Sequence, residues 1–497
     1  MFHFKKKNKI VMKSKIYMAM LLCGLGMTSC TGNFEELDFP KTTSTFIDPA
    51  PILTRSFVTG SGMSVGIWQY SNQLTTLDWA QYMSNINSKF TTTNYEPVPQ
   101  DQVWEWWYSK EAFAGLHLSQ HAIELSQKVE NPVYEAITRI WRAYMFQFIT
   151  DMYGDIPYSE AFKSVSPKYD TQEFIYNDLI NELQTAVKTL KDNKNSGYPS
   201  LGTADVFYNG NLDKWVKLGN SMLIRLAMQC SNVAAEEITK PVLASLNLSD
   251  KANYISSNDD NLKLIPDADG PTFHVKNPFS TVASWDETRI SENLYNRLQV
   301  NDDPRMTLYM SPNSNGDYVG LPSGQSIEDL NSEYKTKYVP NYCDFGPAFI
   351  NDETPFVLMT ASEMAFLLSE ASAKGYIQGD AEAYYNEGIE LSMKQYGISD
   401  TDIAAFKTKA PYSEDNLYTQ FWISLFPNGP QGWNLVRRTG KPSITPLVYH
   451  WPGNENMPRR FSYPTSEIRY NPDNIQEAIT RMGGDSQYTR VWWDSNK

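Results

Sequence analysis

The clearest pattern in the chain is an apolar stripe that recurs every three or four residues after Pro132. This spacing places apolar side chains on one face of an α-helix, because a helix turns once in about 3.6 residues. Pro132 stands just inside the expected start, where its missing N–H costs no helical hydrogen bond. The stripe comprises Val133, Ile137, Ile140, Trp141, Tyr144, Phe148 and Met152. It predicts a long helix with one buried face.

Similar stripes predict further helices, starting near Gln102 and covering residues 171–190, 212–230, 360–375 and 380–396. Before the long helix, the expected buried face comprises Ala114, Leu118, His121, Ala122, Leu125 and Val129. In the helix over 212–230 it comprises Trp215, Leu218, Gly219, Met222 and Leu226. Trp104 and Trp107 share one side of the first helix, and Trp106 points away from them. All three are interpreted mainly as scaffold packing.

The helices over 360–375 and 380–396 are joined by a short turn and resemble one tetratricopeptide unit. A helix pair of this kind buries its apolar face only by stacking on neighbouring pairs. Between about 252 and 354 the periodicity is lost, and long irregular stretches of this kind are usually functional. The expected fold class is therefore mostly α, with stacked tetratricopeptide-like helix pairs and long irregular segments.

The N-terminus predicts the compartment. Six lysines precede a short apolar run over residues 16–27 and the segment Met27-Thr28-Ser29-Cys30. This order is typical of a secretory signal, and the run is too short to span a hydrocarbon core of about 30 Å. The end of the segment resembles the lipobox of bacterial lipoproteins, in which the cysteine is acylated, although Met27 stands where Leu is usual. We expect residues 1–29 to be a signal peptide with Met1 or Met12 as the true start, Cys30 to be the lipidated residue, and residues 30–50 to form a tether.

Charge and composition narrow the function further. The net charge is −14, and cleavage after residue 29 would remove six lysines and no acid. A chain this acidic repels phosphate backbones, so nucleic acid is not expected as a partner. Thirteen Trp and thirty Tyr stand beside only five His, which favours recognition of ligands with both apolar and polar faces. Cys230 and Cys343 permit one disulfide in the mature body but no disulfide framework.

Several motifs together resemble one family. The segment 151–161 reads DMYGDIPYSEA and residues 215–227 read WVKLGNSMLIRLA. Near the C-terminus follow Gly432-Trp433-Asn434, Arg437-Arg438-Thr439-Gly440, Arg459-Arg460-Phe461-Ser462-Tyr463-Pro464, Glu467, Asn471, Asn474, Gly483-Gly484-Asp485 and Val491-Trp492-Trp493-Asp494. In this order, and with the lipoprotein signal, they resemble the SusD/RagB family of nutrient-binding outer-membrane lipoproteins. The resemblance covers nearly the whole mature chain, with residues 51–497 as the binding domain.

The resemblance implies a function without chemistry on the cargo. Members of this family carry tetratricopeptide-like helices, and their irregular segments form the ligand face. They bind oligosaccharides, or peptides in some branches, and act as lids on a SusC-like TonB-dependent transporter. For this chain it implies a surface-exposed, lipid-anchored protein of the outer membrane. An acidic cluster, Glu35, Glu36 and Asp38, resembles the surface-export signal of Bacteroidetes lipoproteins, although an ordinary solvated tether would read the same.

Aromatic rings that cover the flat C–H faces of a sugar, and polar groups that bind its hydroxyls, define the candidate site. An early cluster and one position in the irregular segment supply such groups. The ligand-binding candidates are Trp68, Tyr70, Asp78, Trp79, Tyr82, Tyr95, Trp285 and Arg289, with Asn72 and Gln73 among the first group. For each single aromatic, packing in the core is the competing interpretation.

No catalytic residue, metal ion or cofactor is expected. His117 and His121 have a spacing that can chelate a metal, but no third ligand follows, so a structural role is favoured. Residues 267–270 (DADG) begin like a calcium loop but lack its later ligands, and are interpreted as a turn. The alternatives left open are a peptide- or glycopeptide-capturing lipoprotein of the same architecture and, less favoured, a helical glycoside hydrolase with paired carboxylates.

Overall fold

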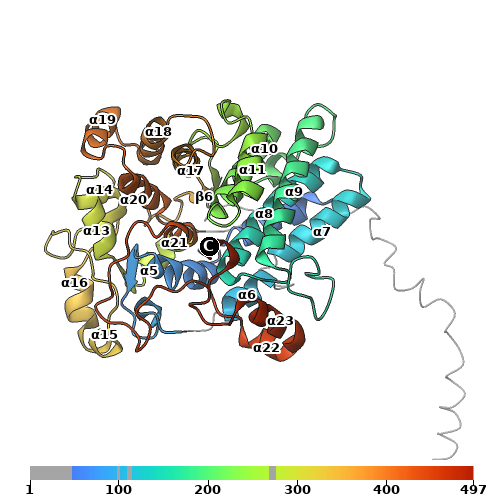
Figure 1. Cartoon of the computed structure of the whole chain (residues 1–497). Helices are drawn as coiled ribbons and strands as arrows, with labels where there is room; N and C mark the ends of the chain where they lie inside the picture. Colours follow the sequence, from blue (N-terminus) through green and yellow to red (C-terminus); the bar gives the residue numbers. More distant parts are fainter. Residues whose placement is uncertain (1–47, 98–100, 109–114, 268–275, 496–497) are drawn as a thin grey trace, which may run out of the picture. The chain divides into compact units, whose positions relative to one another are not determined.

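Helices laid against one another build most of the protein (Figure 1). The computed structural model describes residues 48–97, 101–108, 115–267 and 276–495. These residues belong to one unit, Asp48–Lys497. The helices of its first half are α3 (Ala50–Gly60), α4 (Val65–Trp68), α5 (Thr76–Trp79), α6 (Asp101–Tyr108), α7 (Gly115–Lys128), α8 (Pro132–Tyr153), α9 (Gln172–Asp192), α10 (Leu212–Gln229) and α11 (Lys240–Ser245). A π-helical turn, η1 (Gln69–Gln73), follows α4.

In the second half, five short helices are followed by longer ones, apart from α22. They are α12 (Pro278–Ala283), α13 (Glu292–Gln299), α14 (Met306–Tyr309), α15 (Ile327–Glu333), α16 (Val339–Asn341), α17 (Ala361–Ala373), α18 (Ala381–Lys394), α19 (Asp400–Lys409), α20 (Glu414–Leu425), α21 (Gly429–Thr439), α22 (Thr465–Tyr470) and α23 (Pro472–Met482). None of the helices in the ranges described is long and apolar enough to cross a bilayer.

Three small antiparallel ribbons interrupt the irregular part of the chain. β1 (Met83–Asn85) pairs with β3 (Thr288–Ile290), β2 (Leu262–Leu264) with β6 (Phe356–Met359), and β4 (Met310–Ser311) with β5 (Asp344–Phe345). Lys263 lies opposite Val357 in the second ribbon. Each ribbon joins segments far apart in the chain, so the irregular region is ordered by long-range pairing rather than by local periodicity.

Local sequence sets the ends of the long helices. The Asn131 side chain caps α8 by accepting the backbone N–H groups of Val133 and Tyr134, both at 3.1 Å. Thr171 caps α9 and Asn211 caps α10 in the same way. The stripe predicted for α8 is confirmed, since six of its members are buried and Phe148 is partly buried. The inward face predicted for α10 is buried throughout.

Helices α7 to α10 and the pair α17–α18 pack as successive layers, and α10 also contacts α17 (Figure 1). Gly219 on α10 allows this close approach, because a Cβ there would lie 2.4 Å from Val187 on α9. On α18, a Cβ at Gly388 would lie 2.8 Å from the Phe366 ring. The predicted fold class of tetratricopeptide-like helices is confirmed.

Three sequence expectations need correction or lie outside the described chain. His121 is exposed, and the buried face of α7 is formed instead by Leu116, Ser119, Ala122, Ile123, Leu125 and Ser126. Cys230 and Cys343 are separate buried free thiols, so the disulfide left open by the sequence is not formed. The turn expected over 267–270 falls mostly outside the described residues.

The C-terminal end of α8 holds together segments that are distant in the chain. The buried carboxylate of Asp151 accepts hydrogen bonds from Tyr176 Oη (2.5 Å), Trp493 Nε1 (2.9 Å) and Asn434 Nδ2 (2.9 Å). Arg437 donates to the Asp151 carbonyl at 2.8 Å. Its guanidinium carbon lies 3.3 Å and 4.5 Å from the ring centroids of Trp433 and Trp493. We call Asp151, Tyr176, Asn434, Arg437 and Trp493 the Asp151 cluster.

Other motif residues extend the cluster. Asp155 accepts the N–H of Gln172 at 2.9 Å and Arg481 Nε at 2.8 Å, while Tyr463 donates to the Asp155 carbonyl at 2.6 Å. Arg438 forms a two-bond pair with Glu370 of α17 (2.5 and 2.6 Å). The motifs that carry the family resemblance therefore attach the C-terminal segments to α8 and α17, and Trp493 is buried in the core.

Replacing Asp151 by Ala should lower the free energy of unfolding by at least about 3 kcal/mol. The substitution leaves three buried donors without an acceptor, and each unsatisfied buried group costs about 1–3 kcal/mol. Urea denaturation of the mature chain measures the change. The matched control is Asp192→Ala, because Asp192 is exposed and pairs with the exposed Lys188; it should shift stability by less than about 1 kcal/mol. Equal effects of the two substitutions would contradict the role given to the Asp151 cluster.

Candidate functional site

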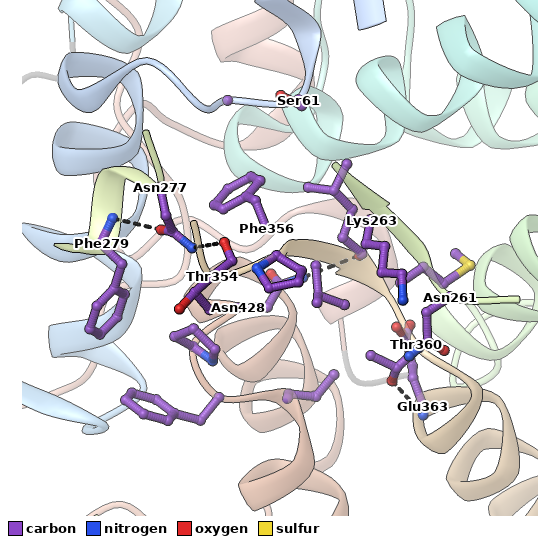
Figure 2. A pocket seen from close by; sticks show the side chains of 18 of the residues that line it. Ser61, Asn261, Lys263, Asn277, Phe279, Thr354, Phe356, Thr360, Glu363 and Asn428 are labelled. Carbon is purple, nitrogen blue, oxygen red and sulfur yellow. Dashed lines mark hydrogen bonds between the residues drawn. The ribbon is translucent and has the colours of Figure 1, made fainter. Parts of the chain in front are cut away.

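A cavity of about 420 Å³ opens between the β2–β6 ribbon, the start of α12 and the start of α17 (Figure 2). The turn Gly60–Gly62, the segment around Phe426 and residues of α4, η1 and α8 also line it. Its volume lies within the range of about 300–1,000 Å³ that is typical of sites for small organic ligands. Among the described residues, its lining combines aromatic rings with amide, hydroxyl and charged side chains.

Aromatic side chains form much of the cavity lining. The Phe279 ring lies 5.0 Å from Trp68, 5.1 Å from Phe349 and 6.2 Å from Phe426, measured between ring centroids. These four rings are buried, which fixes the wall. Phe356 of β6 is only partly buried and lines the cavity from the ribbon (Figure 2). The exposed part of its ring can therefore meet a ligand.

Amide side chains hold the backbone of the cavity wall in place. Asn277 caps α12 by accepting the N–H of Phe279 (2.9 Å), and it donates to the carbonyl of Thr354 (2.9 Å) (Figure 2). Asn72, in η1, accepts the N–H of Gly429 at 3.0 Å. Because these amides bind backbone groups from distant segments, the cavity is formed before any ligand arrives.

The charged side chains around the cavity differ in whether they have an ion-pair partner. Glu363 is buried and pairs with Arg225 through two hydrogen bonds of 2.6 and 2.7 Å. Lys263 is partly exposed, and no carboxylate of the described residues lies within ion-pair distance of its Nζ. Asp259 is exposed at the rim. Burial raises the pKa of the lining residue Tyr144 to about 12, so its hydroxyl stays protonated and can donate.

The structure places six of the eight predicted site residues in the interior. Tyr82 stacks on Trp422 at 4.1 Å and donates to the Trp422 carbonyl at 2.6 Å. Trp79 lies 5.1 Å from Trp433 and donates through Nε1 to the carbonyl of Thr92. The six buried residues are Trp68, Asp78, Trp79, Tyr82, Tyr95 and Arg289. Trp68 lines the cavity, and the other five pack against core side chains, which favours a scaffold role for them.

The other two candidates keep exposed surface. Trp285 is 39% exposed just after α12. Tyr70 is partly buried, with its ring 6.3 Å from Phe90 and 5.6 Å from Trp106. Of the early cluster, the structure brings Trp68 and Asn72 to the cavity. As predicted, Trp104 and Trp107 are buried together, while Trp106 lies toward Tyr70.

Sequence reasoning missed most of the cavity. Lys263, Phe279, Phe356 and Asn428 lie in segments without periodicity, and nothing local distinguishes them from other loop residues. The Asn277-Pro278-Phe279 sequence was the one available signal, because Asn before Pro is typical of a helix start. It indicates a helix but not that its first turn faces a cavity.

The helical layers and a preformed aromatic cavity define a ligand-binding protein of the tetratricopeptide-like class. Residues 42–464 match a family model, SusD-like, that is described as starch-binding and associating with the outer membrane. This match covers most of the chain, so the chain belongs to the SusD-like family. Among curated proteins, none matches the sequence of this chain.

Solved structures of similar proteins agree with this assignment. A chitin-binding protein is 28% identical with a TM-score of 0.77, and the alignment covers 90% of this chain and 100% of that chain. A SusD homolog from Bacteroides uniformis is 25% identical with a TM-score of 0.79 and coverages of 90% and 99%. A chitin-binding SusD homolog from Flavobacterium johnsoniae, 23% identical, has a TM-score of 0.79 and the same coverages.

Asp78 should make the stability of the protein depend on pH. Burial raises the pKa of Asp78 well above its usual value, although the Asn85 N–H and the Thr92 hydroxyl lower it. An acid whose pKa is higher in the folded state stabilises the fold at low pH, and this contribution is lost as pH rises through that pKa. Asp78→Asn should therefore match the wild-type stability near pH 4 and exceed it at pH 8, measured by urea denaturation. Asp192→Asn is the exposed control, and a stability difference independent of pH would contradict the assignment.

Proposed function

We propose that this protein is a surface-exposed, lipid-anchored outer-membrane protein that binds a nutrient glycan and delivers it to a SusC-like TonB-dependent transporter. The observation that carries the proposal is the preformed cavity with aromatic walls and polar groups fixed between them. Sugars offer C–H faces to rings and hydroxyls to amides, so a cavity of this composition suits them. In this proposal residues 1–29 are the signal peptide, 30–50 the lipidated tether and 51–497 the binding domain.

The family and its relatives support a carbohydrate ligand. The family model is described as starch-binding, and two of the similar solved structures are chitin-binding proteins. Oligomers of N-acetylglucosamine and of glucose are therefore the first ligands to test. A peptide or glycopeptide cargo remains an outcome of the same binding assay.

The charge arrangement supports binding without chemistry. Hydrolysis of a glycosidic bond uses two carboxyl groups on either side of the bond, one of which acts as a general acid. Of the two carboxylates that line the cavity, Glu363 is held by Arg225 and Asp259 stands at the exposed rim. Glu363 cannot move toward a ligand without breaking its buried ion pair with Arg225. The carboxylates Glu363 and Asp259 therefore do not supply the two groups that hydrolysis requires.

Phe356→Ala should weaken binding of the cognate oligosaccharide about tenfold, which corresponds to about 1.4 kcal/mol. The substitution removes a ring that lines the cavity, and one aromatic contact contributes about 0.5–1.5 kcal/mol beyond the area it buries. Isothermal titration of chito- and malto-oligosaccharides into the mature chain measures the affinity. Tyr470→Ala is the matched control, because Tyr470 is 70% exposed on α22 and does not line the cavity. Binding that is unaffected by Phe356→Ala would contradict the choice of this cavity, and release of reducing ends would contradict a purely binding role.

Cys30→Ala should release the protein from the membrane. Two acyl chains on the cysteine give stable anchoring, because each buried methylene contributes about 0.8 kcal/mol. Metabolic labelling with a radioactive fatty acid should mark the wild-type protein and not the variant, and the variant should shift to the soluble fraction. Cys230→Ala is the control, since Cys230 is buried in the body and should not affect labelling. A wild-type protein without label would contradict the anchor.

A further inference from the structure

A second, smaller hollow of about 230 Å³ lies on the other side of α8. Phe146 lines this hollow and Phe148 lines the large cavity. Residues two positions apart on a helix point about 200° from each other, so the two sites open on opposite faces of α8. Its lining includes Arg142, Phe146, Tyr158, Phe162, Phe174 and Asp178.

The floor of the hollow is a fixed arginine. The guanidinium carbon of Arg142 lies 5.4 Å from the Phe146 ring and 5.6 Å from the Tyr158 ring, measured to the centroids. Its Nη1 donates to Gln120 Oε1 at 2.9 Å, and its Nη2 lies 3.5 Å from Glu182. A donor group held from both sides in this way loses little conformational freedom when a ligand binds.

Beside the arginine, an acceptor and a ring stand together on α9. Tyr158 Oη donates to Asp178 Oδ2 at 2.7 Å, and no hydrogen bond from the described residues reaches Oδ1. Phe174 precedes Asp178 by four residues, so both side chains lie on one face of the helix. The Phe174 ring is 48% exposed and lies 6.5 Å from Tyr158. An exposed ring can cover the C–H face of a sugar, and the available carboxylate oxygen can accept a hydrogen bond from one of its hydroxyls.

The loop that closes the hollow is held in an unusual conformation. Phe162 has a φ of +64°, which is rare and strained for a bulky residue. Neighbouring contacts hold the loop: the Ser159 N–H donates to Asp170 at 2.7 Å, and Lys163 Nζ donates to the Ser159 carbonyl at 3.0 Å. Strain of this kind persists where the surrounding structure enforces it, and it is found mostly at binding sites and active sites.

We propose that this hollow is a second carbohydrate-binding site that takes one neutral hexose unit. Its volume is below the range of about 300–1,000 Å³ for larger organic ligands, so it suits a single ring or the end of a chain. Arg142 and Lys163 balance Asp178 and Glu182, which favours a neutral ligand. The inference rests on the proposed function, because a second contact matters when the cargo is a glycan. Two sites on one body increase the avidity for a long glycan without any new contact at either site.

The test uses monosaccharides, which are small enough to fit the hollow. Saturation-transfer difference NMR is recorded on the mature chain with glucose, galactose, mannose and N-acetylglucosamine in turn. We expect at least one sugar to give a signal that is lost in Phe174→Ala and in Asp178→Asn. Both side chains are at least partly exposed, so the variants should fold, and thermal unfolding checks this. Tyr198→Ala is the matched control, because Tyr198 is 42% exposed and lies outside the hollow.

The same spectra with Phe356→Ala separate the two sites. A monosaccharide signal that survives Phe356→Ala but not Phe174→Ala supports the second site. Signals that depend on Phe356 alone overturn the second site while leaving the proposed function intact. If neither monosaccharides nor oligosaccharides bind the wild-type chain, the second site and the proposed function both fail.

Discussion

The buried carboxylate of Asp151 is the constraint on which the rest of the structure depends. It lies at the end of α8 and accepts hydrogen bonds from α9, from α21 and from the last turn of the chain. A buried charge of this kind is tolerable only when its hydrogen bonds are complete. Three donors from separate segments must therefore reach it together. Arg437 in addition donates to the backbone carbonyl of Asp151. The cluster thus links the helical layers to the C-terminal region.

This constraint explains how a cavity can exist between irregular segments. Much of its wall comes from stretches of chain near residues 60, 260, 278, 357 and 427. None of these stretches carries a repeating pattern, and their order comes from the layers on either side and from side chains such as Asn72 and Asn277. A preformed site loses less conformational entropy on binding than a loop that orders around its ligand. The helical layers therefore contribute to affinity although most of their residues meet no ligand.

The abundant aromatic residues divide into two groups by environment rather than by type. Tyr82 and Trp79 pack against Trp422 and Trp433, where their polar atoms bind backbone carbonyls. Phe356, Phe174 and Trp285 keep a surface free. The residues that carry the family motifs belong almost entirely to the first group. They specify how the chain closes on itself, whereas the large cavity is lined by residues outside the motifs.

The sequence by itself determined the long helices, their caps and the family. Periodicity and capping act between residues a few positions apart, so local sequence sets the extents of α8, α9, α10, α17 and α18. The motifs at Asp151 and Arg437 identify the family. Only the tertiary structure decided which rings face a ligand. The sequence favoured Trp79 as a site residue and did not point to Phe356, but burial depends on partners hundreds of residues away, such as Trp433 for Trp79. Exposure is a property of the packed whole, and no local pattern encodes it.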